Sequence, residues 1–121
     1  PGVWNEKVRA YLGITPPDDA RGVLQDIHWS AGALGYFPTY ALGNLYAVQF
    51  YRAAAAAIPD LEERFRKGEF TPLLEWLRRE IHRGGRTHRA GDLVRVVTGE
   101  PLNPSYLMEH LERKYGALYA T

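Results

Sequence analysis

The 121-residue chain lacks cysteine, which excludes disulfide scaffolds and thiolate metal sites. It also lacks a charge excess of either sign, with 15 basic and 14 acidic residues. A dedicated nucleic-acid binder usually carries a strong basic excess, so we expect no nucleic-acid partner. No apolar run approaches the roughly 20 residues that span a bilayer, and we expect no membrane partner. The chain has no visible signal peptide, and it begins at Pro1 without methionine, which indicates a processed or excised segment.

The hydrophobic residues that are present, 45% of the chain, are sufficient for one globular domain or a piece of a larger one. Sustained period-two alternation and internal repeats are absent, whereas apolar residues recur at helical spacing. We therefore expect an all-α array with short loops. The expected helices cover residues 4–12, 38–57, 61–67, 71–83 and 91–97, and a last helix starts at Asn103-Pro104.

The sequence makes a specific prediction for each of two of these helices. The helix from Pro38 to Ala57 carries bulky groups on most sides, so it should be buried in a large body. The helix that follows Gly68 has Thr71 and Pro72 at its start, which predicts a cap by the threonine hydroxyl.

The stretch from Gly22 to Tyr46 is rich in aromatic and hydrogen-bonding residues, and Asp26 is its only formal charge. A charge-poor segment of this kind rarely lies on a solvated surface. Its polar groups must be satisfied internally or offered to a ligand. These polar residues are Gln25, Asp26, His28, Ser30, Thr39 and Asn44.

His28 lies between Asp26 and Trp29 in sequence, and two interpretations are open for it. It can be a buried histidine that donates to a backbone carbonyl. Alternatively, its ring donates a hydrogen bond to a reacting oxyanion or to the backbone of a substrate. Asp26 can orient or charge the ring, or it can cap a turn or helix end.

Tyr36, Tyr40 and Asn44 are spaced by four residues, which on a helix forms one stripe. The stripe can be ordinary core packing with satisfied hydroxyls. It can also be a wall of phenolic donors facing a cleft, with one hydroxyl at a developing oxyanion. The sequence does not decide between Tyr36 and Tyr40 for that position.

The chain shows no metal site by itself, because it lacks a His-Glu-x-x-His helix, the pattern that pairs two zinc ligands with a base. His82 and His88 lie among arginines, which is a poor setting for a dication. We interpret that segment as a solvated basic loop.

Residues Gly22–Trp29 match the pattern Gly-x-x-Gln-Asp-x-His-Trp, and the chain resembles the carboxypeptidase Taq family of zinc metallocarboxypeptidases. The likeness continues through residues 35–46, 72–77, 81–82 and 98–104. The whole of 1–121 looks like the C-terminal part of a larger single catalytic domain of such an enzyme. Arginine outnumbers lysine, which is compatible with a Thermus-like thermophile.

The resemblance implies an all-α, multi-helix array that forms one wall of a neurolysin-like peptidase groove. It implies release of single C-terminal residues from peptides, with broad specificity and proline disfavoured. It also implies a cytoplasmic homodimer holding one zinc per intact chain, for which cobalt can substitute. The zinc ligands of the family lie upstream, so this segment alone should be inactive and should pair with the remainder of the same enzyme.

The resemblance assigns roles to residues of this segment. His28 resembles a substrate-binding histidine, and Tyr36 or Tyr40 resembles the tyrosine that stabilises the oxyanion. Gln25, Asp26 and Trp29 would bind substrate or support these residues. The alternative is a non-catalytic helical module that binds a peptide or protein through the Tyr36–Tyr46 surface.

Overall fold

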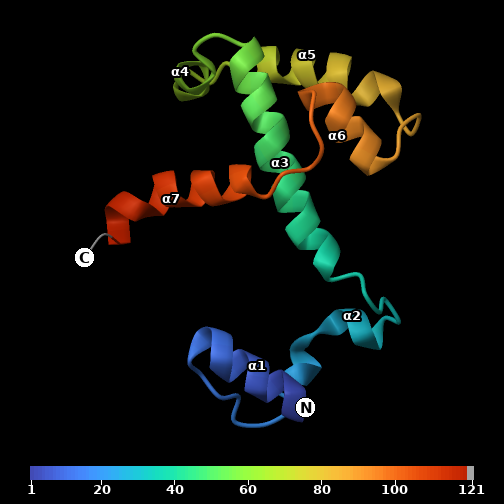
Figure 1. Ribbon diagram of the computed structural model, residues 1–121, viewed down its shortest axis with the longest axis vertical. Helices are drawn as coiled ribbons and strands as arrows, with labels where there is room; N and C mark the ends of the chain where they lie inside the picture. The colour runs from blue at the N-terminus through green and yellow to red at the C-terminus, as the bar shows by residue number, and fades with distance from the viewer. Residues whose placement is uncertain (120–121) are drawn as a thin grey trace. The chain divides into compact units, whose positions relative to one another are not determined.

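The computed structural model describes residues 1–119, and within them every regular element is helical, as predicted (Figure 1). No helix among these residues combines the length and apolar character that crossing a bilayer requires. The α-helices are α1 (Gly2–Leu12), α2 (Ile27–Ser30), α3 (Pro38–Ala57), α4 (Leu61–Arg66), α5 (Thr71–Glu80), α6 (Ala90–Thr98) and α7 (Ser105–Tyr119). Short 3-10 turns occupy Val23–Gln25 and His82–Gly84.

The chain divides into two compact units, Pro1–Thr39 and Tyr40–Thr121. In the first unit, α1 ends where Gly13 takes a left-handed conformation with φ of 70°, which an L side chain disfavours. Trp4 of α1 packs edge-on against Trp29 of α2, with ring centroids 6.1 Å apart. This pair of indoles joins the two helices of the unit across the intervening loop.

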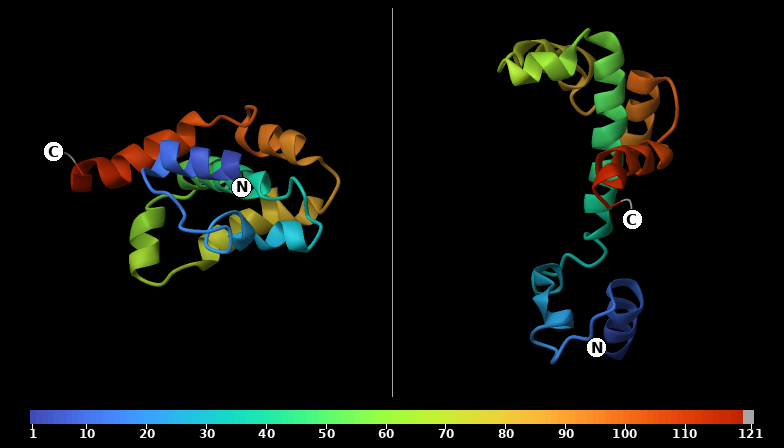
Figure 2. Two further views of the ribbon diagram at one scale, coloured as in Figure 1. Left: turned by 90° about the horizontal axis from the view of Figure 1, so that it is seen from below. Right: turned by 90° about the vertical axis from the view of Figure 1, so that its left-hand side faces the viewer.

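The second unit is built around α3, and its core lies toward the C-terminal end of that helix. Ala54 of α3 packs with Leu61 of α4 and Trp76 of α5, and all three are buried. Partly buried apolar residues surround them, among them Phe50, Phe65, Leu73, Leu77 and Val97. Figures 1 and 2 show α4 and α5 at this end of α3, and α7 crossing nearer its middle.

The bounds of α3 match the predicted 38–57 range, and the packing of this chain by itself buries little of the helix. Gln49 and Ala54 are the residues of α3 that are buried. In its first two turns, Tyr40 and Leu42 are exposed. The apolar face predicted from the sequence is present, therefore, but it lies open over the first half of the helix.

The predicted hydroxyl cap at Thr71 is also wrong. Phe70 occupies the N-cap position of α5, Thr71 is already inside the helix, and no side chain caps this end. A proline is tolerated throughout the first turn of a helix. The Thr71-Pro72 pair therefore predicts where α5 starts but does not determine which residue is its N-cap.

Candidate functional site

Asp26 is the residue immediately before α2. The first N–H groups of a helix have no partner within the helix, so they need acceptors outside it. Asp26 Oδ1 accepts a hydrogen bond from the His28 backbone N–H at 2.9 Å. The same oxygen lies 2.6 Å from His28 Nδ1. Both roles considered for Asp26 from the sequence are therefore present, since it caps α2 and orients the His28 ring.

The electrostatics of this pair follow from its geometry. The pKa of Asp26 lies below its ordinary value, mainly because His28 Nδ1 hydrogen-bonds the ionised carboxyl and secondly because the His28 N–H does so. The side chains of His28 and Asp26 are 19% and 9% exposed, so solvent screens the pair only in part. The imidazole consequently meets a carboxylate at Nδ1.

Aromatic rings enclose His28 on further sides. The Tyr36 ring stacks on it at a centroid distance of 5.6 Å, and the Phe37 ring meets it edge-on at 5.7 Å. Tyr36 precedes the first residue of α3, so the predicted helical stripe of Tyr36, Tyr40 and Asn44 does not include it. Tyr36 lies in the loop between α2 and α3 and contacts His28 from there. A spacing of four residues along a helix does not predict this contact.

A pocket of about 480 Å³ opens beside His28 in the first unit, lined by Trp4, Gln25, Asp26, Ile27, His28, Trp29, Gly35, Phe37 and Pro38. Four of the six residues singled out from the sequence belong to this lining. Gln25 also supports the wall, because its Nε2 donates to the Ala20 carbonyl at 2.5 Å. The pocket is apolar apart from Gln25 and the Asp26–His28 pair, a composition typical of ligand sites.

Tyr40, the remaining predicted residue, belongs to the second unit and lies in the first turn of α3, 52% exposed. The structure thus groups Gln25, Asp26, His28, Trp29 and Tyr36 in one unit.

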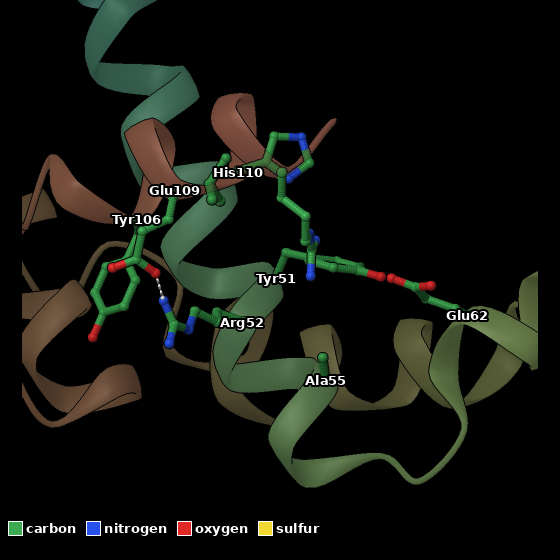
Figure 3. Close-up of a pocket in the computed structure, with 9 residues that line it drawn as sticks. Tyr51, Arg52, Ala55, Glu62, Tyr106, Glu109 and His110 are labelled. Carbon is green, nitrogen blue, oxygen red and sulfur yellow. Dashed lines mark hydrogen bonds and ion pairs between the residues drawn. The ribbon is translucent and has the colours of Figure 1, made fainter. Parts of the chain in front are cut away.

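A second pocket, of about 270 Å³, lies between α3, α4 and α7, and the sequence did not indicate it (Figure 3). Arg52 and Glu109 form an ion pair of 2.5 Å there, and the Arg52 guanidinium lies 4.5 Å from the centre of the Tyr106 ring. Because the Arg52–Glu109 ion pair links α3 to α7, we assign this pocket a role in joining helices. The candidate site is the pocket at His28.

The described residues do not fit a metal ion, since among residues 1–119 no group of three or more His, Cys, Asp or Glu side chains could hold one. His82 lies in a 3-10 turn after α5, and its neighbour Arg83 shares that turn. The residues at the candidate site offer hydrogen bonds, charge compensation and apolar contact.

Comparison with known proteins gives one consistent result. The family model described as carboxypeptidase Taq (M32) metallopeptidase matches residues 1–115. Thermostable carboxypeptidase 1 of Thermus thermophilus is 50% identical over 98% of this chain and 23% of its own length. Carboxypeptidase 1 of Bacillus subtilis is 44% identical over 98% of this chain and 24% of its own length.

Solved structures agree with the sequence relatives. The M32 carboxypeptidase from Deinococcus radiodurans superposes with a TM-score of 0.93 at 39% identity, covering 99% of this chain and 24% of that one. Metallocarboxypeptidase 1 of Trypanosoma cruzi gives a TM-score of 0.89, also at 39% identity, covering 94% of this chain and 24% of that one. The chain spans about a quarter of the length of these relatives. Over that quarter, its sequence and its fold place it in the carboxypeptidase Taq (M32) metallopeptidase family.

Proposed function

We propose that the intact protein is a zinc-dependent metallocarboxypeptidase that releases single C-terminal amino acids from peptides, with broad specificity and proline disfavoured. This chain is the C-terminal helical part of its single catalytic domain and supplies substrate and oxyanion contacts. Family membership over residues 1–115 supports the reaction class. The observation that carries the role of this segment is the Asp26–His28 pair on the wall of an apolar pocket.

In this proposal the zinc ligands lie upstream of the chain, as the resemblance implies, and cobalt can replace zinc there. The metal supplies Lewis-acid chemistry when bound. The residues described here contribute binding and charge stabilisation, since they form no metal-holding group within residues 1–119. We further propose that the intact protein is a cytoplasmic homodimer without nucleic-acid or membrane partners, and that the 121-residue segment alone is inactive.

The Asp26 contact determines what the His28 ring can do. A neutral ring that donates its Nδ1 proton to Asp26, 2.6 Å away, has only a lone pair at Nε2 and would accept a hydrogen bond there. To donate to a substrate carbonyl or an oxyanion, the ring must carry protons on both nitrogens. The Asp26 carboxylate would compensate that positive charge, and we assign the donor role to the doubly protonated ring.

The second donor in the proposal is a phenol, either Tyr36 or Tyr40. A tyrosine hydroxyl donates a hydrogen bond without carrying charge at neutral pH, which suits an oxyanion that forms only in the transition state. Tyr36 stacks on His28, which supports its candidacy. Tyr40 is exposed in the first turn of α3, which supports its access to a substrate.

The test replaces each phenol in the intact enzyme by Tyr36→Phe and Tyr40→Phe. Loss of the oxyanion donor should lower kcat by about 100- to 1,000-fold, while metal content stays at the wild-type level. The variant that retains full turnover is the internal control for the other. Normal turnover in both variants would remove the tyrosine from the proposal.

A non-catalytic helical module that binds a peptide or protein is the second candidate. The observation that favours it is the exposure of Ile27 and Phe37 at the His28 pocket, 73% and 61%. That reading requires the isolated chain to fold stably and remain monodisperse.

A further inference from the structure

Gln49 is a large polar side chain that is completely enclosed, with 2% of its surface exposed. Burying an amide is costly unless its hydrogen bonds are made. Its Nε2 donates to Thr98 Oγ1 and to the Pro101 carbonyl, both at 3.1 Å. Its Oε1 accepts from the Asn103 backbone N–H at 3.0 Å. One side chain of α3 therefore holds the last residue of α6 and two points of the segment that connects α6 to α7.

The same segment determines where α7 begins and how it lies on α3. Asn103 Oδ1 accepts from the Ser105 N–H at 3.0 Å, which caps α7. One turn of α3 beyond Gln49, Arg52 pairs with Glu109 of α7 (Figure 3). The Tyr106 hydroxyl hydrogen-bonds the Glu100 carboxylate while its ring lies under Arg52. These contacts fasten the middle of α3 to the connector and to α7.

Gln49 is also the first residue of α3, followed from its N-terminus, that the packing of this chain by itself buries. The residues before it in the helix are exposed or half-buried. Tyr40 precedes Gln49 by nine residues, a distance of about 13 Å along a helix. A tilt of about 5° at Gln49 would move Tyr40 by about 1 Å, and a misplacement of that size can lower a catalytic rate about 100-fold.

We propose that Gln49 is a positioning residue of the peptidase site, which acts by fixing the direction of the first half of α3 and so the place of the Tyr40 hydroxyl. This inference rests on the proposed function and adds to it a residue outside the His28 pocket. It commits the oxyanion role to Tyr40, which the proposed function leaves open between two tyrosines.

The test uses Gln49→Met in the intact enzyme, which keeps the size of the side chain and removes all its hydrogen bonds. Because the contact that is lost serves the transition state, kcat and kcat/KM should fall by the same factor, up to about 100-fold, with KM unchanged. Thr98→Val removes one acceptor of Gln49 and should act in the same direction with a smaller factor. It serves as the second variant if Gln49→Met fails to fold.

A control variant with a similar loss of stability distinguishes a positioning role of Gln49 from a general weakening of the fold. Leu61→Ala removes a buried side chain of α4 that is 3% exposed and belongs to the core cluster beyond Gln49. At a temperature where it is folded, this variant should keep wild-type kcat and KM while its Tm falls. Gln49→Met should lose turnover at that temperature.

The double variant Gln49→Met/Tyr40→Phe identifies the route of the effect. If Gln49 acts through Tyr40, the double variant should be no slower than Tyr40→Phe alone, because both changes remove the same contact. The inference would be overturned if the double variant lost kcat by the product of the two single losses. It would also be overturned if Gln49→Met lowered Tm and left kcat unchanged. Full turnover in Tyr40→Phe together with loss in Tyr36→Phe would also overturn it while leaving the proposed function intact.

Discussion

At the scale of single residues, the central feature is one carboxylate oxygen of Asp26 that serves two N–H groups of His28. The backbone contact begins α2, and the ring contact fixes the imidazole. Because one residue makes both contacts, substitutions that keep the cap and remove the charge can separate folding from chemistry. The Asp26–His28 pair is therefore the most informative place to change single atoms.

Asp26→Asn is the substitution that tests this separation in the intact enzyme. Asparagine caps a helix about as well as aspartate, so α2 should persist and Tm at neutral pH should fall less than in Asp26→Ala. The charge that compensates a His28 imidazolium is lost, so kcat should fall, by less than in His28→Gln. Asp26→Ala, which removes the cap as well, should lower both kcat and Tm. Equal turnover in Asp26→Asn and the wild type, measured by release of C-terminal residues, would contradict the imidazolium role.

The lowered pKa of Asp26 makes a prediction about acid stability. A carboxyl whose pKa is depressed in the folded state contributes stability above its unfolded pKa, and this contribution is lost as pH falls through the folded value. The hydrogen bond from His28 is the main cause of the depression. Between about pH 4, the unfolded value, and the lower folded value, the free energy of unfolding should fall more steeply in the wild type than in Asp26→Asn. Parallel curves in urea titrations across this range would show that the pair adds no pH-dependent stability.

At the scale of elements, local start and stop signals predicted much of the fold. Gly13 ends α1 in a left-handed conformation, Pro38 begins α3, and Asn103 caps α7. These signals succeed because a proline or a left-handed glycine restricts only its own few residues. Thr71 failed as a cap because the chain could place Phe70 at that position and take the hydroxyl into the helix.

Contacts between distant residues were beyond the reach of the sequence. Helical spacing placed Gln49 within the expected helix of residues 38–57, whereas its hydrogen-bond partners lie about 50 positions further along, at Thr98, Pro101 and Asn103. Tyr36 was placed in a stripe by spacing, but it meets His28 from a loop. The Gly22–Trp29 motif contributes Gln25, Asp26, His28 and Trp29 to the lining of one pocket, because residues close in the chain fold together there.

Gly22, the first residue of that motif, allows a packing prediction. A Cβ added there would lie 3.1 Å from the Asp18 carbonyl oxygen and from Pro16 Cβ, so the turn would have to open. Gly22→Ala should lower the free energy of unfolding by about 1–3 kcal/mol, as overpacking typically does. Gly91→Ala is the matched control, because a Cβ in that turn of α6 meets nothing within 4 Å. It should be neutral or raise stability by about 0.5–1 kcal/mol, and two variants of equal stability would refute the packing explanation.

At the scale of the whole molecule, the chain exposes more large apolar side chains than it buries. The buried apolar residues in the described range 1–119 are Val23, Ala54, Leu61, Trp76 and Val94. The exposed large ones include Tyr11, Ile27, Leu34, Phe37, Tyr40, Leu118 and Tyr119. Exposed apolar surface on this scale marks an interaction site or a source of aggregation. The relatives are about four times longer, and we propose that the remainder of the enzyme covers these groups.

The isolated 121-residue chain should therefore be poorly folded and inactive. With a small buried core, we expect dye binding, weak near-ultraviolet circular dichroism and no sharp unfolding transition, the signs of a loosely packed state. The intact enzyme at equal concentration is the control. A monodisperse isolated chain that unfolds cooperatively would favour the peptide- or protein-binding module instead.

We propose that this segment supplies transition-state contacts to a site whose metal is held elsewhere in the enzyme. The most direct test of this proposal is one parallel measurement of kcat and bound metal for His28→Gln in the intact enzyme. We expect wild-type metal content and a fall in kcat of about 100- to 1,000-fold, the typical effect of removing an oxyanion donor. Unchanged turnover, or turnover that falls only in proportion to lost metal, would contradict it.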